Sequence, residues 1–212
     1  MIVSTWSNVA VSVESALAAG VAITAISKAN PGVASTATTP TAGEYVLLTV
    51  QGMHQVDGRV FRVGTVVPAT SFQLEGENTT DYGTFTSGTY QTITFGTSVS
   101  TITGVTASGG EWEFDDVTTI HETQRSQIPT VASAMTFSME SIWDAADTGL
   151  AALEAASKLK DTRAVHIAFS NGQRVLFNGY VGLTMVPVGE AHRKVTTPLV
   201  FTVQRRLTRY AT

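Results

Sequence analysis

The sequence predicts a mainly β protein in which one short α-helix lies over an antiparallel sheet and a small β module is inserted in the first half of the chain. Three features carry this prediction. Apolar residues alternate with polar ones after residue 131, one helical segment lies at about residues 147–159, and Asn171-Gly172 separates two apolar runs. Alternation indicates strands, and Asn-Gly between apolar runs is the strongest short-range hairpin signal.

The composition agrees with this class. Charged residues make up 14% of the 212 residues, against roughly 25% in an average domain. A low charge favours strands and turns over solvated helices, and it weakens the repulsion between copies of the chain. The composition therefore fits a protein whose copies associate. It fits a weakly charged monomeric β protein equally well.

The N-terminal segment, residues 1–26, opens with valines that alternate from Val9 to Val13 and predict a strand. We expect a helical turn at residues 15–19 and a second strand from Ala22 to Ile26. Both belong to the same domain as the second half of the chain in this interpretation.

From about residue 27 the chain changes to short strand-like runs, such as Tyr45 to Val50 and Val60 to Val67, separated by turn signals such as Asp57-Gly58. Runs spaced in this way without a helix predict a compact β unit. We therefore expect residues 27–95 to form an inserted module, and residues 1–26 plus 96–212 to form the other domain.

After a turn at residues 108–110, a strand is expected to begin at Glu111. Because side chains alternate along a strand, Glu111, Glu113 and Asp115 share one face, and Trp112 and Phe114 share the other. The aromatic side is the one that should be buried, which leaves the acidic side facing water.

A polar segment without periodicity follows, and loops of this length in compact domains tend to bind something. We expect it to be a subunit contact loop. Its residues are Thr118, Thr119, Ile120, His121, Glu122, Thr123, Gln124, Arg125, Ser126, Gln127, Ile128 and Pro129, with Thr130 at its end.

The last part of the chain is expected to form a strand, a helix and a meander. Met135, Phe137 and Met139 share one strand face, and Asp147 is placed to cap the first N–H groups of the helix. Two strands flank Asn171-Gly172, where both turn residues favour positive φ, and a further strand is expected at residues 194–204.

Several functions lack a signature. A net charge of −4 and a pI of about 5.5 do not indicate a nucleic-acid binder. The chain has no cysteine, which excludes disulfides, thiolate metal sites and cysteine nucleophiles. His121-Glu122 beside Asp115-Asp116 could bind a cation, but a solvated strand end explains these residues better. We therefore expect no metal site.

The N-terminus shows no basic region followed by an apolar core, and the apolar stretch at residues 16–26 is shorter than a membrane span. We expect a soluble protein made in a cytoplasm, with no membrane insertion. The arginines Arg205, Arg206 and Arg209 form a basic tail. The tail is either a disordered charged end or a site of pairing between stacked copies of the chain.

An ordered series of segments resembles the tail tube proteins of long-tailed bacteriophages, over about residues 95–205 and more loosely over residues 1–26. The segments that carry it are Ile102-Thr-Gly-Val105, Phe114-Asp-Asp-Val-Thr-Thr119, Ile128-Pro129, the strand with Met135 to Met139, the helix, Asn171-Gly172, Val175 to Val181 and Val195 to Val203.

The resemblance implies a β-sandwich or barrel-like fold flanked by one helix. It further implies six copies in a ring, stacked rings that form the conduit for genome delivery, and no catalysis or cofactor. The implied partners are other copies of the chain, a tail terminator and tail tip proteins. DNA would pass through without specific binding, and the protein would be made in the host bacterial cytoplasm and end in the virion tail. The module at residues 27–95 would lie on the tube exterior.

Within a tube, an acidic wall would prevent adhesion of DNA phosphates. Glu111, Glu113 and Asp115 are therefore candidates to face the lumen, and the alternative is the solvent-facing half of an ordinary strand. The alternative function is a monomeric β-sandwich binding module, of carbohydrate-binding or adhesin-like type, that uses the loop at residues 118–130 as its contact surface.

Overall fold

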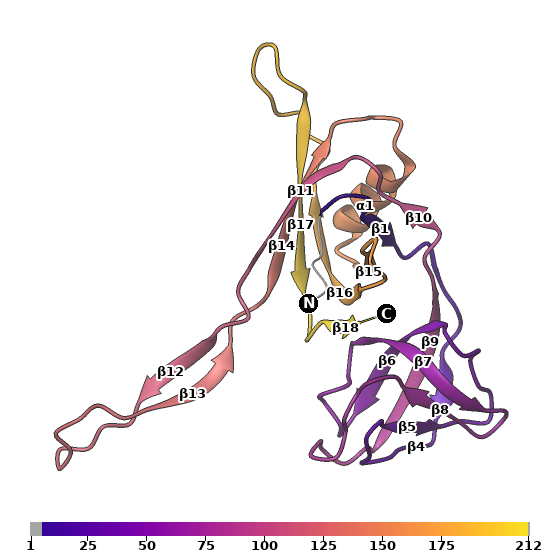
Figure 1. Ribbon diagram of the computed structural model, residues 1–212, viewed down its shortest axis with the longest axis vertical. Coiled ribbons are helices and arrows are strands. Elements are labelled where there is room, and N and C mark those ends of the chain that lie inside the picture. The colour runs from indigo at the N-terminus through magenta and orange to yellow at the C-terminus, as the bar shows by residue number, and fades with distance from the viewer. Residues whose placement is uncertain (1–5, 212) are drawn as a thin grey trace.

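The computed structural model describes residues 6–211. Residues 1–5 and 212, which belong to the expected larger domain, lie outside this range. The described chain forms eighteen strands and one helix, arranged as two sheets and a projecting hairpin (Figure 1). The expected mainly β fold with antiparallel sheets and one helix is confirmed. The first sheet does not close into a barrel, since within residues 6–211 its path ends at β10 and β11.

The first sheet has the strand order β10-β1-β15-β16-β17-β14-β11, with β18 paired to β16. We refer to this sheet and helix α1 as the body. Its strands are β1 (Ala10–Val13), β10 (Thr97–Ser98), β11 (Ile102–Ser108), β14 (Thr136–Ile142), β15 (Thr162–Ala168), β16 (Arg174–Leu183), β17 (Thr196–Val203) and β18 (Thr208–Tyr210).

The single helix, α1 (Thr148–Leu159), lies where the sequence predicts it. Asp147 is the N-cap, and its side chain accepts a 2.9 Å hydrogen bond from the backbone N–H of Leu150. Leu150 and Leu153 are fully buried against the first sheet. Met139 is buried in the same core, and the neighbouring Phe137 packs against it. The helix therefore covers the inner face of the sheet.

The hairpin between β15 and β16 forms as expected, but its turn differs. Gly172 has a φ of 90°, whereas Asn171 does not take a positive φ. The N–H of Gly172 donates to the carbonyl of Phe169 at 3.0 Å, and the N–H of Phe169 donates to the carbonyl of Gln173 at 2.9 Å. The loop thus contains three residues, and in such loops only the last one needs positive φ.

The second sheet has the order β2-β9-β6-β7-β8-β5-β4, with β3 paired to β9. We call the residues that form it, 16–94, the module. Its strands are β2 (Ala16–Leu17), β3 (Val21–Ile23), β4 (Ala25–Ile26), β5 (Val33–Ser35), β6 (Tyr45–Gln51), β7 (Val60–Val67), β8 (Ser71–Leu74) and β9 (Ser87–Thr94). A core of its own includes the fully buried Phe61 and Phe72.

The start of the chain contributes to this second sheet. The expected helical turn at residues 15–19 is wrong, because Ala16 and Leu17 pair with Thr94 and Ile93 of β9. In addition, β4 pairs with β5 across the expected boundary at residues 26 and 27, with Ala25 opposite Ser35. The backbone groups of these short segments are satisfied by the edges of the module rather than by a local helix.

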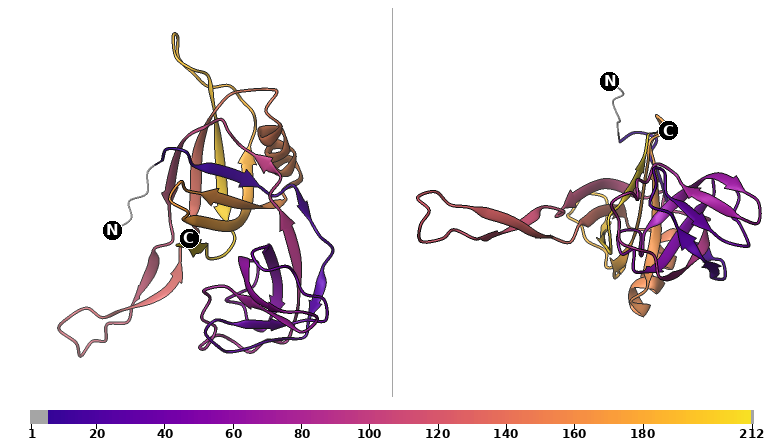
Figure 2. Two further views of the ribbon diagram at one scale, coloured as in Figure 1. Left: turned by 45° about the vertical axis from the view of Figure 1, so that its right-hand side comes forward. Right: turned by 90° about the horizontal axis from the view of Figure 1, so that it is seen from below.

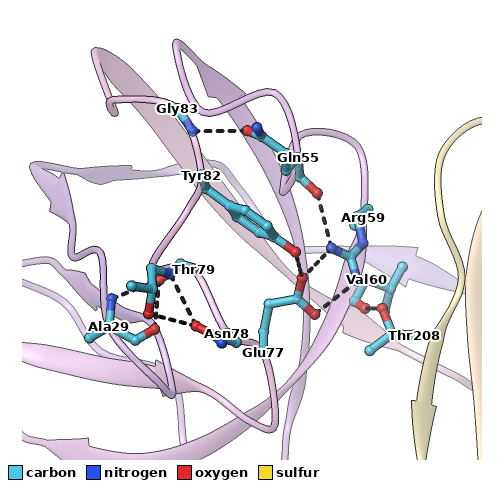
Figure 3. Close-up of polar contacts among 11 residues, drawn as sticks. Ala29, Gln55, Arg59, Val60, Glu77, Asn78, Thr79, Tyr82, Gly83 and Thr208 are labelled. Carbon is cyan, nitrogen blue, oxygen red and sulfur yellow. Dashed lines mark hydrogen bonds and ion pairs between the residues drawn. The ribbon is translucent and has the colours of Figure 1, made fainter. Parts of the chain in front are cut away.

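A buried ion pair fixes the loops of the module (Figure 3). Arg59 and Glu77 are 5% and 12% exposed and meet in a two-point contact, with Nη2 to Oε2 at 3.0 Å. The hydroxyl of Tyr82 donates to the same carboxylate at 2.5 Å, and Arg59 also donates to the carbonyl of Gln55 at 2.9 Å. Burial raises the pKa of Tyr82, with its bond to Glu77 as the second cause. The Glu77 carboxylate thus joins three segments of the module.

The module and the body share a third apolar cluster. Leu47, Val60 and Ile93 of the module meet Ala164, Leu176 and Tyr210 of the body. At the same junction, the Thr208 hydroxyl donates to the Val60 carbonyl at 2.7 Å and the Arg62 N–H donates to the Tyr210 hydroxyl at 2.7 Å.

The C-terminal segment is therefore ordered at this junction. The alternative of a disordered basic end is wrong for the described part of the tail, because Thr208 and Tyr210 are buried in strand β18. Burial raises the pKa of Tyr210 to about 12. Arg209, which lies between them, is exposed, as are Arg205 and Arg206.

Candidate assembly surface

A two-stranded hairpin leaves the body after β11 and returns to it at β14. This arm, residues 109–134, contains β12 (Trp112–Asp116), β13 (Gln127–Ala132) and a tip loop at residues 117–126. Every residue from 106 to 132 is exposed, and both views of Figure 2 show the arm, beyond its root, projecting away from the body and the module. Two paired strands alone are marginally stable in water, so the arm lacks a core within the described subunit.

Two glycines at the root set the direction of the arm. Gly109 and Gly110 have φ values of 81° and 82°. A Cβ at Gly109 would lie 2.1 Å from the carbonyl oxygen of Ala134, so only glycine fits there. The sequence predicts a reversing turn, but the hairpin ladder continues, since the N–H of Gly110 donates to the Ser133 carbonyl at 3.1 Å. The glycines bend the strand pair rather than reverse it.

The two faces of β12 differ in chemistry. Trp112 and Phe114 lie on one face, and each is 60% exposed. Glu113 and Asp115 lie on the other face, also exposed. A bulge separates the Trp112–Ala132 pair from the Phe114–Pro129 pair. The expectation that the aromatic side is buried is therefore wrong for the isolated subunit.

The tip loop is closed by local hydrogen bonds. The N–H of Thr118 donates to the carboxylate of Asp116 at 2.9 Å, and the N–H of Val117 donates to the Ser126 carbonyl at 3.0 Å. The hydrogen bonds from Thr118 lower the pKa of Asp116. At the far end, Ile120 is 95% exposed. The tip therefore presents an aliphatic side chain beyond a closed polar neck.

The expected contact loop is placed in two parts. Residues Thr118 to Ser126 lie in the tip, whereas Gln127, Ile128 and Pro129 belong to β13. Glu111 precedes β12, and Asp115 stands opposite Ile128. The expected acidic face therefore includes an apolar residue, and it lies on the arm rather than on either large sheet.

A second exposed apolar region lies at the opposite end of the molecule, where the loop at residues 184–195 connects β16 and β17 (Figure 1). Val186 and Val188 are about half exposed there, and Ile142 is exposed at the end of β14. The indole N–H of Trp143 donates to the Met185 carbonyl at 3.1 Å and holds the base of the loop. Sequence reasoning missed this region, although Val186-Pro-Val188 is an apolar run next to a turn.

Within residues 6–211, no three His, Asp or Glu side chains come together in a way that would hold a metal ion. The helix of the described chain is too short and too polar to span a membrane. The arm presents two exposed aromatic side chains, Trp112 and Phe114, and the loop at residues 184–195 presents exposed valines at the other end.

These features define a mainly β protein with exposed apolar side chains at both ends. The profile of the family described as "Phage tail tube protein, TTP" matches residues 51–212. The chain belongs to this family of phage tail tube proteins, which are structural rather than enzymatic. The match includes the arm, the helix, the meander and the second half of the module.

A solved structure described as "Tail of empty GTA particle computed with helical refinement, C6 symmetry" is similar over 56% of this chain and 87% of that chain, with 14% identity and a TM-score of 0.41. No curated protein matched the chain.

Proposed function

We propose that copies of this tail tube protein assemble into hexameric rings that stack into the conduit for genome delivery, and that the arm makes contacts between subunits. The observation that carries the proposal is the 60% exposure of both Trp112 and Phe114 on an arm without a core. Large exposed apolar patches mark interaction sites, and aromatic residues are enriched where proteins meet.

The remaining parts of the proposal follow from the family. The number six, passage of DNA without specific binding, and contacts with a tail terminator and tail tip proteins are what the resemblance to tail tube proteins implies. The subunit would be made in the host bacterial cytoplasm and become part of the virion tail. The edge strands β10 and β11, each of which pairs on one side only within residues 6–211, offer backbone groups for contacts within a ring.

The test is to remove the aromatic face of the arm. The double variant Trp112→Ser with Phe114→Ser should stay folded and soluble but no longer form rings or tubes in negative-stain images. The matched control is Leu159→Ser, because Leu159 is 69% exposed at the end of α1, away from the arm. Deleting residues 120–127 tests the tip in the same way.

Normal tubes from both arm variants would contradict the proposal. If the unmodified chain stays a monomer at high concentration, a monomeric binding module is favoured instead.

We also propose that the inserted unit lies on the tube exterior and comprises residues 16–94 rather than 27–95. The support is the pairing of β2 and β3 with β9 and of β4 with β5, which ties residues 16–26 to the second sheet. Imaging tubes that carry a bulky tag in the turn after Gly43 would locate the module. Extra density in the channel would contradict an exterior position.

The placement of Glu111, Glu113 and Asp115 in the lumen stays a prediction, and it is an alternative to the burial of Glu113 and Asp115 in a contact between subunits. A second candidate for the lumen wall is the outward face of β11, β14 and β17. There, Thr106 stands beside Ser138 and Val200, and Gly104 stands beside Glu140 and Pro198. If the arm lines the channel, lysine at Glu111, Glu113 and Asp115 should make tubes retain short duplex DNA there. If the outward face of the sheet lines the channel, Glu140→Lys should have this effect. Low salt is required, since salt weakens phosphate contacts.

A further inference from the structure

We infer that the acidic face of the arm binds a groove on a second copy of the chain, where the C-terminal arginines lie. The inference rests on the proposed role of the arm in assembly and names the surface that receives it. The groove has a volume of about 740 Å³ and lies between the module, the root of the arm and the segment after β17. Its lining includes His54, Trp112, Arg205, Arg206 and Arg209.

The backbone that carries the groove's arginines is fixed, and their side chains are exposed. Thr208 and Tyr210 are buried on either side of Arg209, so strand β18 fixes the segment. Arg206 and Arg209 are exposed, and within residues 6–211 neither makes an ion pair. Arg205 pairs with Asp57 at 3.2 Å but remains 53% exposed. The groove therefore presents at least two guanidinium groups without a carboxylate partner.

The arm carries the complementary charge. The arm carries five carboxylates between Glu111 and Glu122 and one arginine, Arg125, so its net charge is negative. Glu113 and Asp115 are exposed on β12, and within the described chain no ion pair joins the arm to the body or the module. Charge complementarity of this kind steers association and fixes register.

The acidic face of the arm does not face the groove of its own subunit. Trp112 lines the groove of its own chain, and Glu113 and Asp115 lie on the opposite face of β12. The arm also extends away from the body (Figure 1). Its acidic face is therefore left for another copy. Each subunit then gives one arm and receives one, which is the head-to-tail type of contact that closes a ring or extends a filament.

Crosslinking tests the contact directly, because the chain has no cysteine of its own. The double variant Asp115→Cys with Arg206→Cys, assembled and treated with a flexible bis-maleimide, should give a ladder of covalent multimers on a denaturing gel. Asp115→Cys alone should stop at dimers, and the double variant diluted below assembly should give no multimers. Tubes from the double variant without a ladder would overturn the inference and leave the proposed assembly intact. Absence of tubes from the unmodified chain would instead contradict the proposed function.

A charge exchange covers the case in which the cysteine variant fails to assemble. Asp115→Arg and Arg206→Asp should each raise the critical concentration for assembly about tenfold, which corresponds to about 1.4 kcal/mol. Combining both substitutions in one chain should restore the critical concentration to near its original value, since the charges on the two sides of every contact are then exchanged. Unchanged assembly of the single variants, or no recovery in the combination, would overturn the inference. A third result would also overturn it. If the unassembled subunit binds a short DNA duplex and Arg206→Asp removes that binding, the groove is a nucleic-acid site.

Discussion

The arm and the module are both built from short antiparallel strands, but they differ in what stabilises them. The module buries a core that includes Phe61 and Phe72 and packs on the body through a second cluster. In the arm, every residue from 109 to 132 is exposed. Hydrophobic burial is the main favourable term in folding, so the module is stable within the subunit, whereas the arm has its apolar residues available for other molecules.

The largest expected effect comes from replacing the module, residues 16–94, with a Gly/Ser linker. This change exposes Leu176 and Tyr210 of the body, which are buried in the junction. Exposing two such side chains should cost about 3–6 kcal/mol of unfolding free energy. Thermal unfolding should show a much lower Tm or an insoluble chain. An unchanged Tm would show that the junction contributes nothing to the body.

The next prediction compares one phenylalanine from each region. Phe61→Ala in the module core should lower the unfolding free energy by about 3–5 kcal/mol. Phe114→Ala on the arm should change it by less than about 0.5 kcal/mol, as is usual for surface positions, and yet impair assembly. Denaturant unfolding of the unassembled subunit together with sedimentation of tubes would measure both. Equal losses of stability would remove the contrast between the two regions.

A smaller effect is expected at the root of the arm. Gly109→Ala places a Cβ 2.1 Å from the Ala134 carbonyl oxygen at a φ of 81°. The strain should cost about 1–3 kcal/mol and redirect the arm, so tubes should be lost while the body stays folded. Gly43→Ala is the matched control, because its φ is also positive, at 87°, and nothing lies within 4 Å of a Cβ there. Similar assembly of both variants would show that the direction of the arm does not matter.

The smallest effect concerns pH at the junction. His166 packs against the rings of Tyr45 and Phe95, and burial, with the charge of Arg174 second, lowers its pKa from 6.5 to about 4. The folded state therefore keeps His166 neutral, while the unfolded state takes up a proton below pH 6.5. The resulting stability is complete above pH 6.5 and is lost as the pH falls toward 4.

Allowing for partial solvent screening, the loss should be about 1–2 kcal/mol. Comparing the pH dependence of unfolding with that of His166→Phe isolates the effect. Glu14, whose pKa is raised by burial, has the opposite pH dependence in both chains and cancels in the comparison. Parallel curves for the two chains would contradict the assignment.

The parts of the fold that sequence reasoning predicted are those set by local chemistry. Asp147 caps α1, and the alternation of Met135, Phe137 and Met139 directs them toward one core. Pairings between distant segments were missed. Ala16 pairs with Thr94, and Thr208 bonds to Val60 across 148 positions of sequence. Short runs such as these carry no local signal of which strand edge they join.

The two faces of the arm could be predicted from the sequence, but their exposure could not. The alternation of Glu113 and Asp115 with Trp112 and Phe114 is visible in the sequence, and the two faces are present in β12. Sequence reasoning assumed that an aromatic face is covered within the subunit. It could not show that the hairpin ladder continues through Gly109 and Gly110 and carries this face away from the body. The burial of an aromatic face depends on tertiary placement, which alternation does not encode.

Hydrogen exchange of the subunit and of assembled tubes tests the central claim most directly. In the unassembled subunit, backbone amides of residues 111–132 should exchange quickly, because this region has few buried contacts, while those of β6 and β7 should be protected. In tubes, we predict at least about a hundredfold slower exchange across β12 and β13, which corresponds to about 2.7 kcal/mol, with little change in the module. Fast exchange of the arm in well-formed tubes would contradict the claim that the arm is the contact between subunits.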